Sequence, residues 1–330
     1  MPLMPRTLEP APAPGPDLAE GSAATSTLPA APPAAATETF DREGPRPVGR
    51  PRFFSTAWFA FIHLTALGVV WVGASWTAVL FCVALYFVRM FAIVAGYHRH
   101  FSHRSYETSR VFRFLIGLVG TTAIQKGPLW WASVHRHHHR FSDLPEDAHS
   151  PKQRGFWFAH IGWILVPDFD KVDWDRVRDL SKYPEIRLLD RIHWLAPILL
   201  TFGTYFFGEW LASAHPSLGT SGLQLLVWGM GISTTLVYHG SWSVNSILHL
   251  WGGRRFKTSD TSRNNVLVAL YTLGEGWHNN HHRYMNSERQ GFYWWQIDIA
   301  HMLLRTLSYV GLVWDLKVPP RAILDEGRAS

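Results

Sequence analysis

The stretch Trp130–Phe141 reads WWASVHRHHHRF and carries four histidines, of which His135, His138 and His139 stand at positions i, i+3 and i+4. An α-helix brings residues three and four apart onto one face, so this spacing predicts a helix with three imidazoles stacked within about one turn. Imidazole nitrogen is a good ligand for iron, zinc, copper and nickel. The stretch therefore indicates a metal site, although one such box alone is only moderately specific.

Two further clusters of histidines lie elsewhere in the chain. The i, i+3, i+4 spacing returns near the C-terminus in GEGWHNNHH, at His278, His281 and His282. An upstream cluster in GYHRHFSHRSY contains His98, His100 and His103. One metal ion takes at most about six ligands and a structural zinc only about four, so nine or more histidines indicate two ions. Carboxylates that could orient these imidazoles lie close in sequence, namely Asp143, Glu146, Asp147 and Glu275.

The composition is that of a membrane protein. Only 17% of the residues are charged, whereas soluble domains have about 25%. The chain also contains 17 tryptophans, which favour the membrane–water interface. The formal net charge of +6 is not accompanied by a basic helix or an RNA-binding motif. We therefore expect no nucleic-acid partner and assign the excess charge to loops that face anionic lipid.

The cysteine content limits the metal chemistry. The single cysteine, Cys82, lies within an apolar run, which excludes an intramolecular disulfide framework and a cysteine-ligated zinc or iron–sulfur site. Since the chain has 18 histidines, any metal is expected to be bound by nitrogen. Isolated histidines in apolar runs are expected to be packed or hydrogen-bonded residues, and these are His63, His193 and His239.

Four apolar runs are long enough to cross a membrane, for which about 20 residues are needed. They are Phe53–Trp76, Thr77–Tyr97, Ile192–Leu211 and Leu223–Trp242. The link Gly73-Ala74-Ser75 predicts a helical hairpin, and Arg89 inside the second run is expected to face protein or water. Arginines precede the first run and basic residues follow the fourth, whereas residues 212–222 contain none. The positive-inside rule therefore predicts that both termini and all histidine boxes are cytoplasmic.

Other segments complete the domain organisation. Residues 1–48 are rich in Pro, Ala and Thr without periodicity and are expected to form a disordered tail. A membrane domain is expected over 49–317 and a C-terminal tail over 318–330. Within the domain, we expect interfacial helices in Val111–Ile124 and Gly155–Val166, and an amphipathic helix, in place of a fifth span, in Phe292–Leu316.

The boxes HRHFSH, HRHHH and GEGWHNNHH resemble those of membrane fatty-acyl desaturases, in particular the Δ9 acyl-CoA and acyl-lipid group and its bacterial branch. The likeness extends over Phe53–Leu316. NSILH at Asn245–His249 resembles the NSxxH segment of that family, and RGFWFAHIGWIL at Arg154–Leu165 resembles the segment after its second box. The resemblance implies an all-α integral membrane protein, with four transmembrane helices under a cytosolic helical cap that holds a dimetal centre.

The resemblance also implies the metal ligands. Two iron ions would be held by nine histidines, which correspond to His98, His103, His135, His138, His139, His249, His278, His281 and His282. Asn245 would reach one metal through water, whereas His100 and His137 have no counterpart. The family uses O2 and two external electrons to introduce a cis double bond, here expected at Δ9, into a saturated acyl chain.

A bent tunnel for the acyl chain is a further implication of the resemblance. Gln125, Trp131 and Ser241 match residues at the bend, and Tyr86 matches the residue that closes the far end. Met90 lies one helical turn from Tyr86, where animal enzymes often have a small residue. A shorter tunnel, with a preference for a palmitoyl over a stearoyl chain, is therefore expected.

The acyl carrier is expected to be coenzyme A or a lipid. The positions that grip CoA in the animal enzymes correspond to Lys126, Ser133, Val134, Pro167 and Asp168, of which only Lys126 can meet a phosphate. QKGPLWW instead resembles bacterial and cyanobacterial members, some of which act on lipid-linked chains. The sequence has neither a cytochrome b5 HPGG segment nor a dinucleotide fingerprint. Electrons are therefore expected from a separate ferredoxin, rubredoxin or cytochrome b5 with its reductase.

Two other functions share some of these features. A membrane hydroxylase or alkane monooxygenase has similar histidine boxes, and the NSxxH segment and Trp131 favour desaturation over it only by resemblance. A His-rich metal transporter would carry its ligands within the spans near mid-membrane, whereas the boxes here lie at span ends and in loops. We therefore expect a fatty-acyl desaturase.

Overall fold

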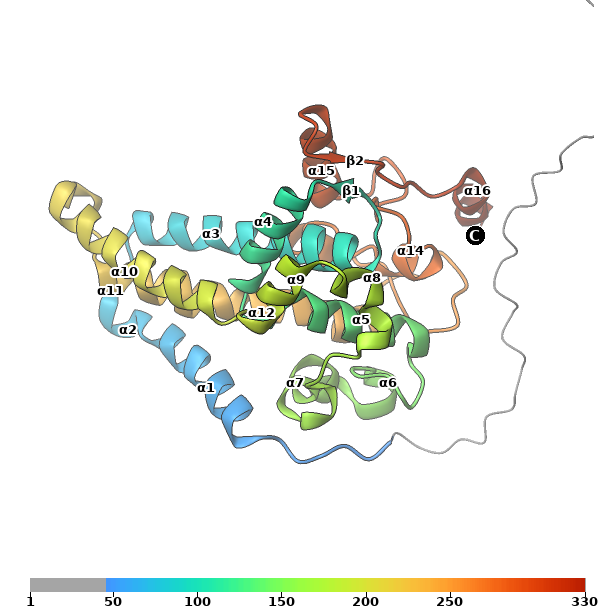
Figure 1. Ribbon diagram of the computed structural model, residues 1–330, viewed down its shortest axis with the longest axis horizontal. Coiled ribbons are helices and arrows are strands. Elements are labelled where there is room, and N and C mark those ends of the chain that lie inside the picture. The colour runs from blue at the N-terminus through green and yellow to red at the C-terminus, as the bar shows by residue number, and fades with distance from the viewer. Residues whose placement is uncertain (1–45, 330) are drawn as a thin grey trace, which may run out of the picture. The chain divides into compact units, whose positions relative to one another are not determined.

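The computed structural model of the chain describes residues 46–329. The predicted tail over 1–48 lies outside the described residues, apart from its last three positions. In the described part the chain is almost entirely helical, and its strands are Glu107–Thr108 (β1) and Val313–Trp314 (β2), which pair antiparallel (Figure 1). The mostly helical architecture predicted from the sequence is confirmed.

Three helices of the described chain are long and apolar enough to cross a membrane. The first is α1 (Phe53–Leu67) continued by α2 (Val69–Val72). The second is α3 (Trp76–Phe91) continued by the π-helix η1 (Ala92–Ser102), and the third is α10 (Leu195–Ala214). In Figure 1, α1 runs obliquely to α3 and α10.

The link between the first two spans forms the predicted hairpin. Gly73 has a φ of 65°, in the left-handed region that glycine adopts without strain. Ser75 then caps the second span, because its side chain accepts a hydrogen bond from the backbone N–H of Ala78 at 3.1 Å. The chain therefore reverses within three residues, and α1 and α3 then diverge while both pack against η6 (Val227–Ile232) and α12 (Ser233–Ser246).

The predicted fourth span is a continuous helical run of α11 (Gly222–Leu226), the π-helix η6 (Val227–Ile232) and α12 (Ser233–Ser246). This run is not among the three helices that qualify by length and hydropathy. It contains buried polar side chains, such as those of Gln224 and Thr234, which lower its mean hydropathy. The count of four spans is therefore not established by composition.

Some of the polar side chains of this run contact Arg89 of α3. Arg89 is fully buried and donates hydrogen bonds to Ser233 Oγ at 2.5 Å and to Thr234 Oγ1 at 2.8 Å. A third bond reaches the Gly229 carbonyl at 2.9 Å. Because an unpaired charge in hydrocarbon is costly, the polar groups of η6 and α12 are what allow Arg89 to face protein inside the bundle.

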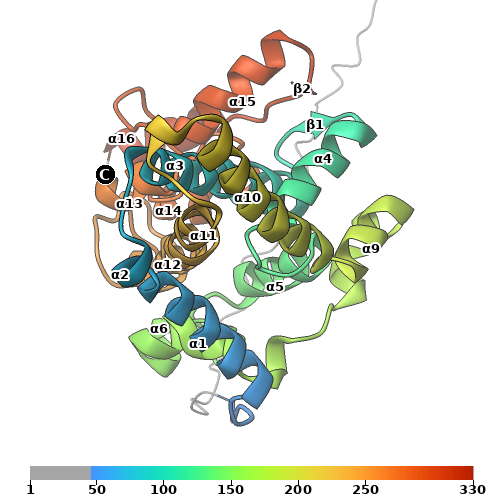
Figure 2. The ribbon, with the colours of Figure 1, turned by 90° about the vertical axis from the view of Figure 1, so that its left-hand side faces the viewer.

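Shorter helices form the part of the chain that carries the histidine boxes. Those between the second and third spans are α4 (Arg110–Thr121), α5 (Pro128–Phe141), α6 (Pro151–Arg154), η2 (Phe158–Gly162), α7 (Trp163–Leu165), η3 (Pro167–Phe169), η4 (Trp174–Val177), α8 (Arg178–Ser181) and α9 (Pro184–Arg191). The turn η5 (Pro216–Leu218) links α10 to α11. After α12 come η7 (Ile247–His249), α13 (Val266–Tyr271), α14 (His278–Arg283), α15 (Ile299–Tyr309) and α16 (Arg321–Ala329), and Figure 2 shows the same elements after a quarter turn.

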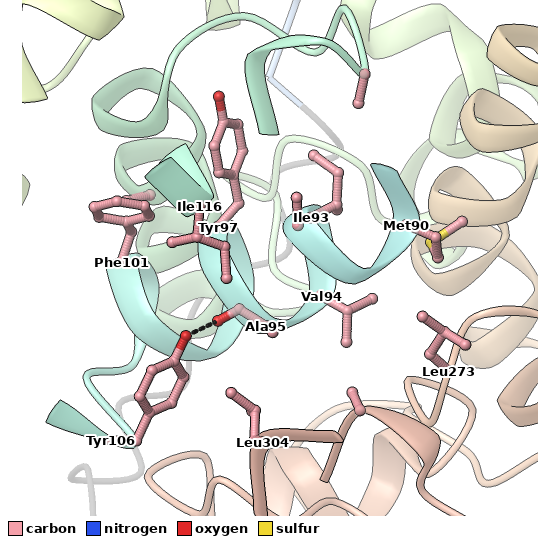
Figure 3. Packing of buried hydrophobic residues seen from close by; sticks show 14 of the residues in the cluster. Met90, Ile93, Val94, Ala95, Tyr97, Phe101, Tyr106, Ile116, Leu273 and Leu304 are labelled. Atoms are coloured by element: carbon pink, nitrogen blue, oxygen red, sulfur yellow. Dashed lines mark hydrogen bonds between the residues drawn. The ribbon is translucent and has the colours of Figure 1, made fainter. Parts of the chain in front are cut away.

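The main hydrophobic core surrounds η1, where the second span leaves the apolar bundle (Figure 3). Val94, Tyr97 and Phe101 of η1 are buried among side chains of α4, α5 and α15. Tyr106 folds back over this segment and donates from its hydroxyl to the Ala95 carbonyl at 3.0 Å. The end of the second span is thereby fixed, and with it the first histidine box.

The expected interfacial segments have exposed apolar faces. In α4, Val111 and Leu115 are exposed, whereas Arg113 is buried with its guanidinium 4.3 Å from the ring centroid of Tyr183. In the region 292–316 only α15 is a long helix, and its 11 residues are too few for a fifth span. Met302 of α15 is exposed. Both segments therefore present apolar side chains outward, as an interfacial location requires.

A glycine at the start of the third histidine box tests how tightly this region is packed. A Cβ on Gly276 would lie 2.1 Å from the backbone nitrogen of Ala269 and 2.3 Å from the carbonyl oxygen of Asn265. Because these are backbone atoms that cannot rotate away, we expect Gly276→Ala to cost about 1–3 kcal/mol of folding free energy. The measurement is thermal unfolding of the detergent-solubilised protein, followed by size-exclusion chromatography.

The matched control is Gly203→Ala on α10, where a Cβ would meet nothing within 4 Å. This variant is expected to unfold at the same temperature as the unsubstituted protein or slightly above it, because alanine favours a helix interior over glycine. Equal unfolding temperatures for the two variants would show that the contact at Gly276 is not rigid.

Candidate metal centre and substrate cavity

The first histidine pair is set by the π-helix that ends the second span. In η1 the hydrogen bonds join residues five apart, so such residues lie one above the other. The backbone N–H of His103 donates to the carbonyl of His98 at 3.2 Å, and the two ring centroids are 4.9 Å apart. The HxxxxH spacing therefore brings both imidazoles to one side.

In both α5 and α14, the three histidines at i, i+3 and i+4 point in two directions. In α5, His135 and His139 lie one helical turn apart and join one group, whereas His138 joins another. In α14 the arrangement is inverted, because His281 joins the group of His135 while the other two histidines join His138. The face predicted from the i, i+3, i+4 spacing is thus divided between two groups.

Nine histidines form these two groups, within each of which the ligand atoms lie within 4.8 Å of one another. The first group is His98, His103, His135, His139 and His281, and the second is His138, His249, His278 and His282. The Nε2 atoms face one another: those of His103 and His135 are 2.8 Å apart, and those of His278 and His282 are 3.0 Å apart. The structure therefore brings together all nine histidines that the sequence analysis singled out, and their role as ligands stays a prediction.

Carboxylates contact the outer nitrogen, Nδ1, of four of these histidines. The pairs are His138–Asp147 (3.0 Å), His249–Asp143 (3.2 Å), His282–Asp260 (2.6 Å) and His98–Glu275. A carboxylate in this position accepts the Nδ1–H, so the lone pair of Nε2 is directed into the group. Each pair therefore fixes both the tautomer and the direction of its imidazole.

The sequence analysis identified three of these four carboxylates. Glu146, the remaining candidate, instead forms an ion pair with Arg46 at 2.8 Å. Asp260 was missed because it lies 22 residues before His282 in a polar TSDTS segment that indicates only a loop. Its side chain also accepts hydrogen bonds from Ser262, which orient the carboxylate.

Burial and the neighbouring imidazoles keep most of these histidines neutral. Burial, and then repulsion by nearby histidines, lower the pKa of His135 and His139 well below the usual value. Burial lowers the pKa of His282 to about 4, although Asp260 opposes the shift. At His138, burial disfavours the charged form, but Asp147 outweighs it and raises the pKa. Neutral imidazoles have the free lone pair that metal binding requires.

Both groups fit a metal centre. They offer only imidazole nitrogen, which suits iron, zinc, copper or nickel. The Nε2 atom of His138 is buried and has no hydrogen-bond partner among residues 46–329. A buried polar atom without a partner is costly, and a cation at the centre of each group would satisfy it together with the Nε2 lone pairs that face it.

An apolar cavity of about 870 Å3 reaches the first group. His135 and Asn245 line it, together with Gln125, Trp131 and Ser241. The Gln125 side-chain amide donates to Ser241 Oγ at 2.7 Å, and the Trp131 indole N–H donates to Gln125 Oε1 at 3.3 Å. Trp131 stacks on His135 with ring centroids 4.9 Å apart. The three residues expected at the bend thus form one hydrogen-bonded unit beside the first group.

The two residues expected at the far end of the tunnel lie elsewhere. Met90 is fully buried in the main core, and Tyr86 donates from its hydroxyl to the carbonyl of Tyr271 at 2.7 Å. Both contact Gly240, where a Cβ would be 2.8 Å from Met90 Cε and 2.9 Å from the Tyr86 hydroxyl. Since Gly240 precedes Ser241, they lie on a neighbouring face of α12, and neither lines the cavity described above.

The two extra histidines of the boxes lie outside both groups. His100 hydrogen-bonds from Nδ1 to the carbonyl of Tyr106 at 3.1 Å, and its Nε2 accepts from Arg113 at 3.1 Å. His137 hydrogen-bonds from Nε2 to the carbonyl of Glu146 at 2.8 Å. Both imidazoles are therefore occupied by ordinary protein contacts, which agrees with leaving them out of the ligand set.

A separate row of histidines lies between α1, α12 and η2. His63 hydrogen-bonds from Nδ1 to the carbonyl of Phe59 at 2.7 Å, and its Nε2 lies 3.0 Å from Nε2 of His239. Nδ1 of His239 lies 2.9 Å from Nε2 of His160, whose Nδ1 lies 2.8 Å from Ser246 Oγ. His63 and His239 are therefore hydrogen-bonded, as expected, and the row ties α1 to α12.

Comparisons with known proteins agree with this site. A family model described as "Fatty acid desaturase" matches residues 74–315. The chain is 39% identical over 249 residues to the acyl-CoA C20 Delta5-desaturase of Anemone leveillei, and the alignment covers 74% of this chain and 75% of that protein. It is 37% identical over 264 residues to Delta-9 acyl-lipid desaturase 1 of Arabidopsis thaliana, with 78% and 81% covered.

These relatives differ in the double-bond position and in the acyl carrier that their names state. They agree in the reaction class, and the family match extends over most of the described chain. The same region contains two of the three apolar helices long enough to cross a membrane in full, and both histidine groups. The chain therefore belongs to the membrane fatty acid desaturases, oxidoreductases that act on fatty-acyl substrates.

Proposed function

We propose that this chain is an O2-dependent Δ9 desaturase that introduces a cis double bond into a saturated acyl chain carried by coenzyme A or by a lipid. The observation that carries the proposal is the pair of all-imidazole groups beside an apolar cavity of about 870 Å3. Removing hydrogen from an unactivated methylene requires a stronger oxidant than any side chain. The Δ9 position is supported by the resemblance of the boxes and by the named Δ9 relative.

The nine histidines would hold two iron ions, and Asn245 would contact one of them through water. When bound, the iron pair supplies the O2 chemistry by which hydrogen is taken from two adjacent carbons, at the cost of two electrons and two protons and with release of two waters. The carboxylates Asp143, Asp147, Asp260 and Glu275 hold the Nδ1 protons, so that the lone pairs stay directed inward.

The cavity residues position the acyl chain. Trp131 stacks on His135, and its indole N–H bonds to Gln125, which in turn bonds to Ser241. This rigid unit is proposed to bend the chain so that one C–C bond lies beside the histidine groups. The apolar wall excludes water from the reacting carbons.

In the membrane we propose four spans, with the run from α11 to α12 as the fourth, under a cytosolic helical cap. The two termini and the histidine groups would be cytoplasmic, because Arg50 and Arg52 precede the first span and Arg254, Arg255 and Lys257 follow the fourth. Electrons would come from a cytoplasmic ferredoxin, rubredoxin or cytochrome b5 with its reductase. No nucleic-acid partner is proposed.

The reaction is tested by producing the chain, with a donor system, in a host that lacks aerobic desaturases. The expected product is a cis-Δ9 monoene, located by mass spectrometry of derivatised fatty-acid esters. His138→Ala should abolish it and reduce bound iron, because it removes a ligand of the second group. The control His215→Ala changes an exposed histidine on the α10–α11 link and should leave the product unchanged. A hydroxylated acid in place of the monoene would show that the chain is an oxygenase and not a desaturase.

The carboxylate behind His282 provides a second test. Asp260→Asn replaces the acceptor of the His282 Nδ1–H with an amide, so the imidazole is less well oriented. Metal affinity or activity should fall about 10–100-fold. Iron content after dialysis against graded chelator measures the affinity, and Asp325→Asn, on an exposed carboxylate of α16, is the control. Equal iron retention in the two variants would contradict the orienting role.

Chain-length preference tests the proposed role of Met90. Met90 and Tyr86 meet at Gly240, next to Ser241, outside the apolar cavity. We propose that the tunnel continues past the bend to these two residues, which close it and favour a palmitoyl chain. Met90→Ala removes a fully buried side chain and should raise the ratio of stearoyl to palmitoyl desaturation. Met302→Ala on the exposed face of α15 should not change that ratio. An unchanged ratio in both variants would show that Met90 does not close the tunnel.

A further inference from the structure

The apolar cavity has a rim that lies on the spanning helices. Its wall includes Trp58 and Phe61 of α1, and Ile198 and Phe202 of α10. Phe61 and Phe202 line the cavity and yet are 52% and 60% exposed, whereas His135 on the same wall is 8% exposed. Side chains that are exposed and also line a cavity mark its opening. The cavity therefore opens between α1 and α10, on the side of the bundle where lipid would lie.

The cavity is long enough to extend along the depth of the membrane. Lining residues of the run from α11 to α12 begin at Leu223 and end at Asn245. At 1.5 Å per residue these positions are roughly 33 Å apart along the helix axis, close to the hydrocarbon thickness of about 30 Å. Figure 1 shows α1 running obliquely to α12, and α1 packs mainly against η6 and α12. Most of the wall is apolar, as acyl chains require.

We propose that the acyl chain enters through this opening from within the bilayer, while it is esterified to a membrane glycerolipid with a neutral or zwitterionic headgroup. This inference rests on the proposed desaturase function and assigns its carrier. A CoA-linked chain would instead approach from water and bring several phosphate charges. The entrance for such a chain would need free cations to bind these phosphates. The charged side chains around the cavity show whether such cations are present.

Three of the cations near the cavity, Lys126, Arg46 and Arg176, are already paired with carboxylates. Lys126, the one residue that was expected to meet a phosphate, forms an ion pair with Asp170 and lies 4.3 Å over the ring of Trp130. A second cavity of about 320 Å3 shares Val134 with the apolar one. Its charged lining residues are Arg46, Arg154, Lys171 and Arg176 together with Glu146, Asp168 and Asp173. A polyphosphate there would meet three carboxylates.

Two of the four cations in that second cavity are bound to its own acids. Arg46 pairs with Glu146 at 2.8 Å, and Arg176 with Asp173 at 2.7 Å. The surface is therefore nearly balanced in charge, which suits a neutral or zwitterionic head better than CoA. The apolar opening and the nearly balanced charge both favour a glycerolipid over CoA as the acyl carrier.

Photolabelling tests the route without any turnover. The full chain is reconstituted in phosphatidylcholine vesicles that contain phosphatidylcholine with a diazirine on its palmitoyl chain, irradiated, and digested for mass spectrometry. The expected adducts lie on Ile62, Thr201 and Trp131, which line the cavity, and excess palmitoyl-CoA leaves them in place. Adducts confined to the outer face of α10, such as Leu199 and Phe206, would overturn the proposal, as would displacement by palmitoyl-CoA.

Turnover then tests the carrier with two neighbouring substitutions. Ile198 lines the cavity and Leu199 does not, although both are exposed on α10. With donor and isotopically labelled palmitoyl phosphatidylcholine, Ile198→Trp should lower monoene formation at least about fivefold, and Leu199→Trp by less than about twofold. Monoene formation from palmitoyl-CoA alone would overturn the inference and leave the desaturase function intact. No monoene from either carrier would overturn the proposed function, whatever the photolabelling shows.

Discussion

The inward direction of nine imidazole lone pairs is the constraint on which this structure depends. For the metal centre proposed above, each Nε2 must be unprotonated and aimed at the centre of its group, and a ring that rotates or takes up a proton no longer contributes a lone pair. The chain meets this constraint by burial, which disfavours the charged form, and by carboxylates on the outer nitrogens. Four segments that are far apart in sequence must therefore be held rigidly around two points.

A buried ionic network supplies much of this rigidity. Arg99, which follows His98, is 1% exposed and contacts Glu275, Glu288 and Asp298. Glu275 also contacts His98, so the same carboxylate joins the second span to the C-terminal segment. An unpaired buried charge would be strongly destabilising, so the network holds only when every member is in place. The order of the histidine groups is thereby linked to the folding of residues far beyond them.

The residues of the site could be predicted from the sequence, but the division of the histidines between two groups could not. Spacing alone located His135, His138 and His139 on one helix, and proximity identified Asp143 and Asp147 as orienting groups. It did not reveal that α5 and α14 divide their histidines in opposite proportions between two groups, because that depends on how the two helices face each other. Asp260 was missed for the same reason, since a loop carboxylate gains its role only through tertiary contact. The fourth run is less apolar than the three spans because it carries polar side chains, two of which, Ser233 and Thr234, bond to Arg89.

The hydrogen bonds along the row of histidines between α1 and α12 limit which nitrogen of each ring can carry a hydrogen. The Phe59 carbonyl can only accept, so Nδ1 of His63 must carry the hydrogen and its Nε2 must accept. With neutral rings, His239 then donates from Nε2 and accepts at Nδ1, and His160 donates from Nε2. The single hydroxyl hydrogen of Ser246 donates to the carbonyl of Trp242 at 3.0 Å, so Ser246 Oγ can only accept from Nδ1 of His160. The four contacts of the row therefore need four N–H hydrogens, whereas three neutral imidazoles carry three, so every contact is a hydrogen bond only when the row holds one added proton.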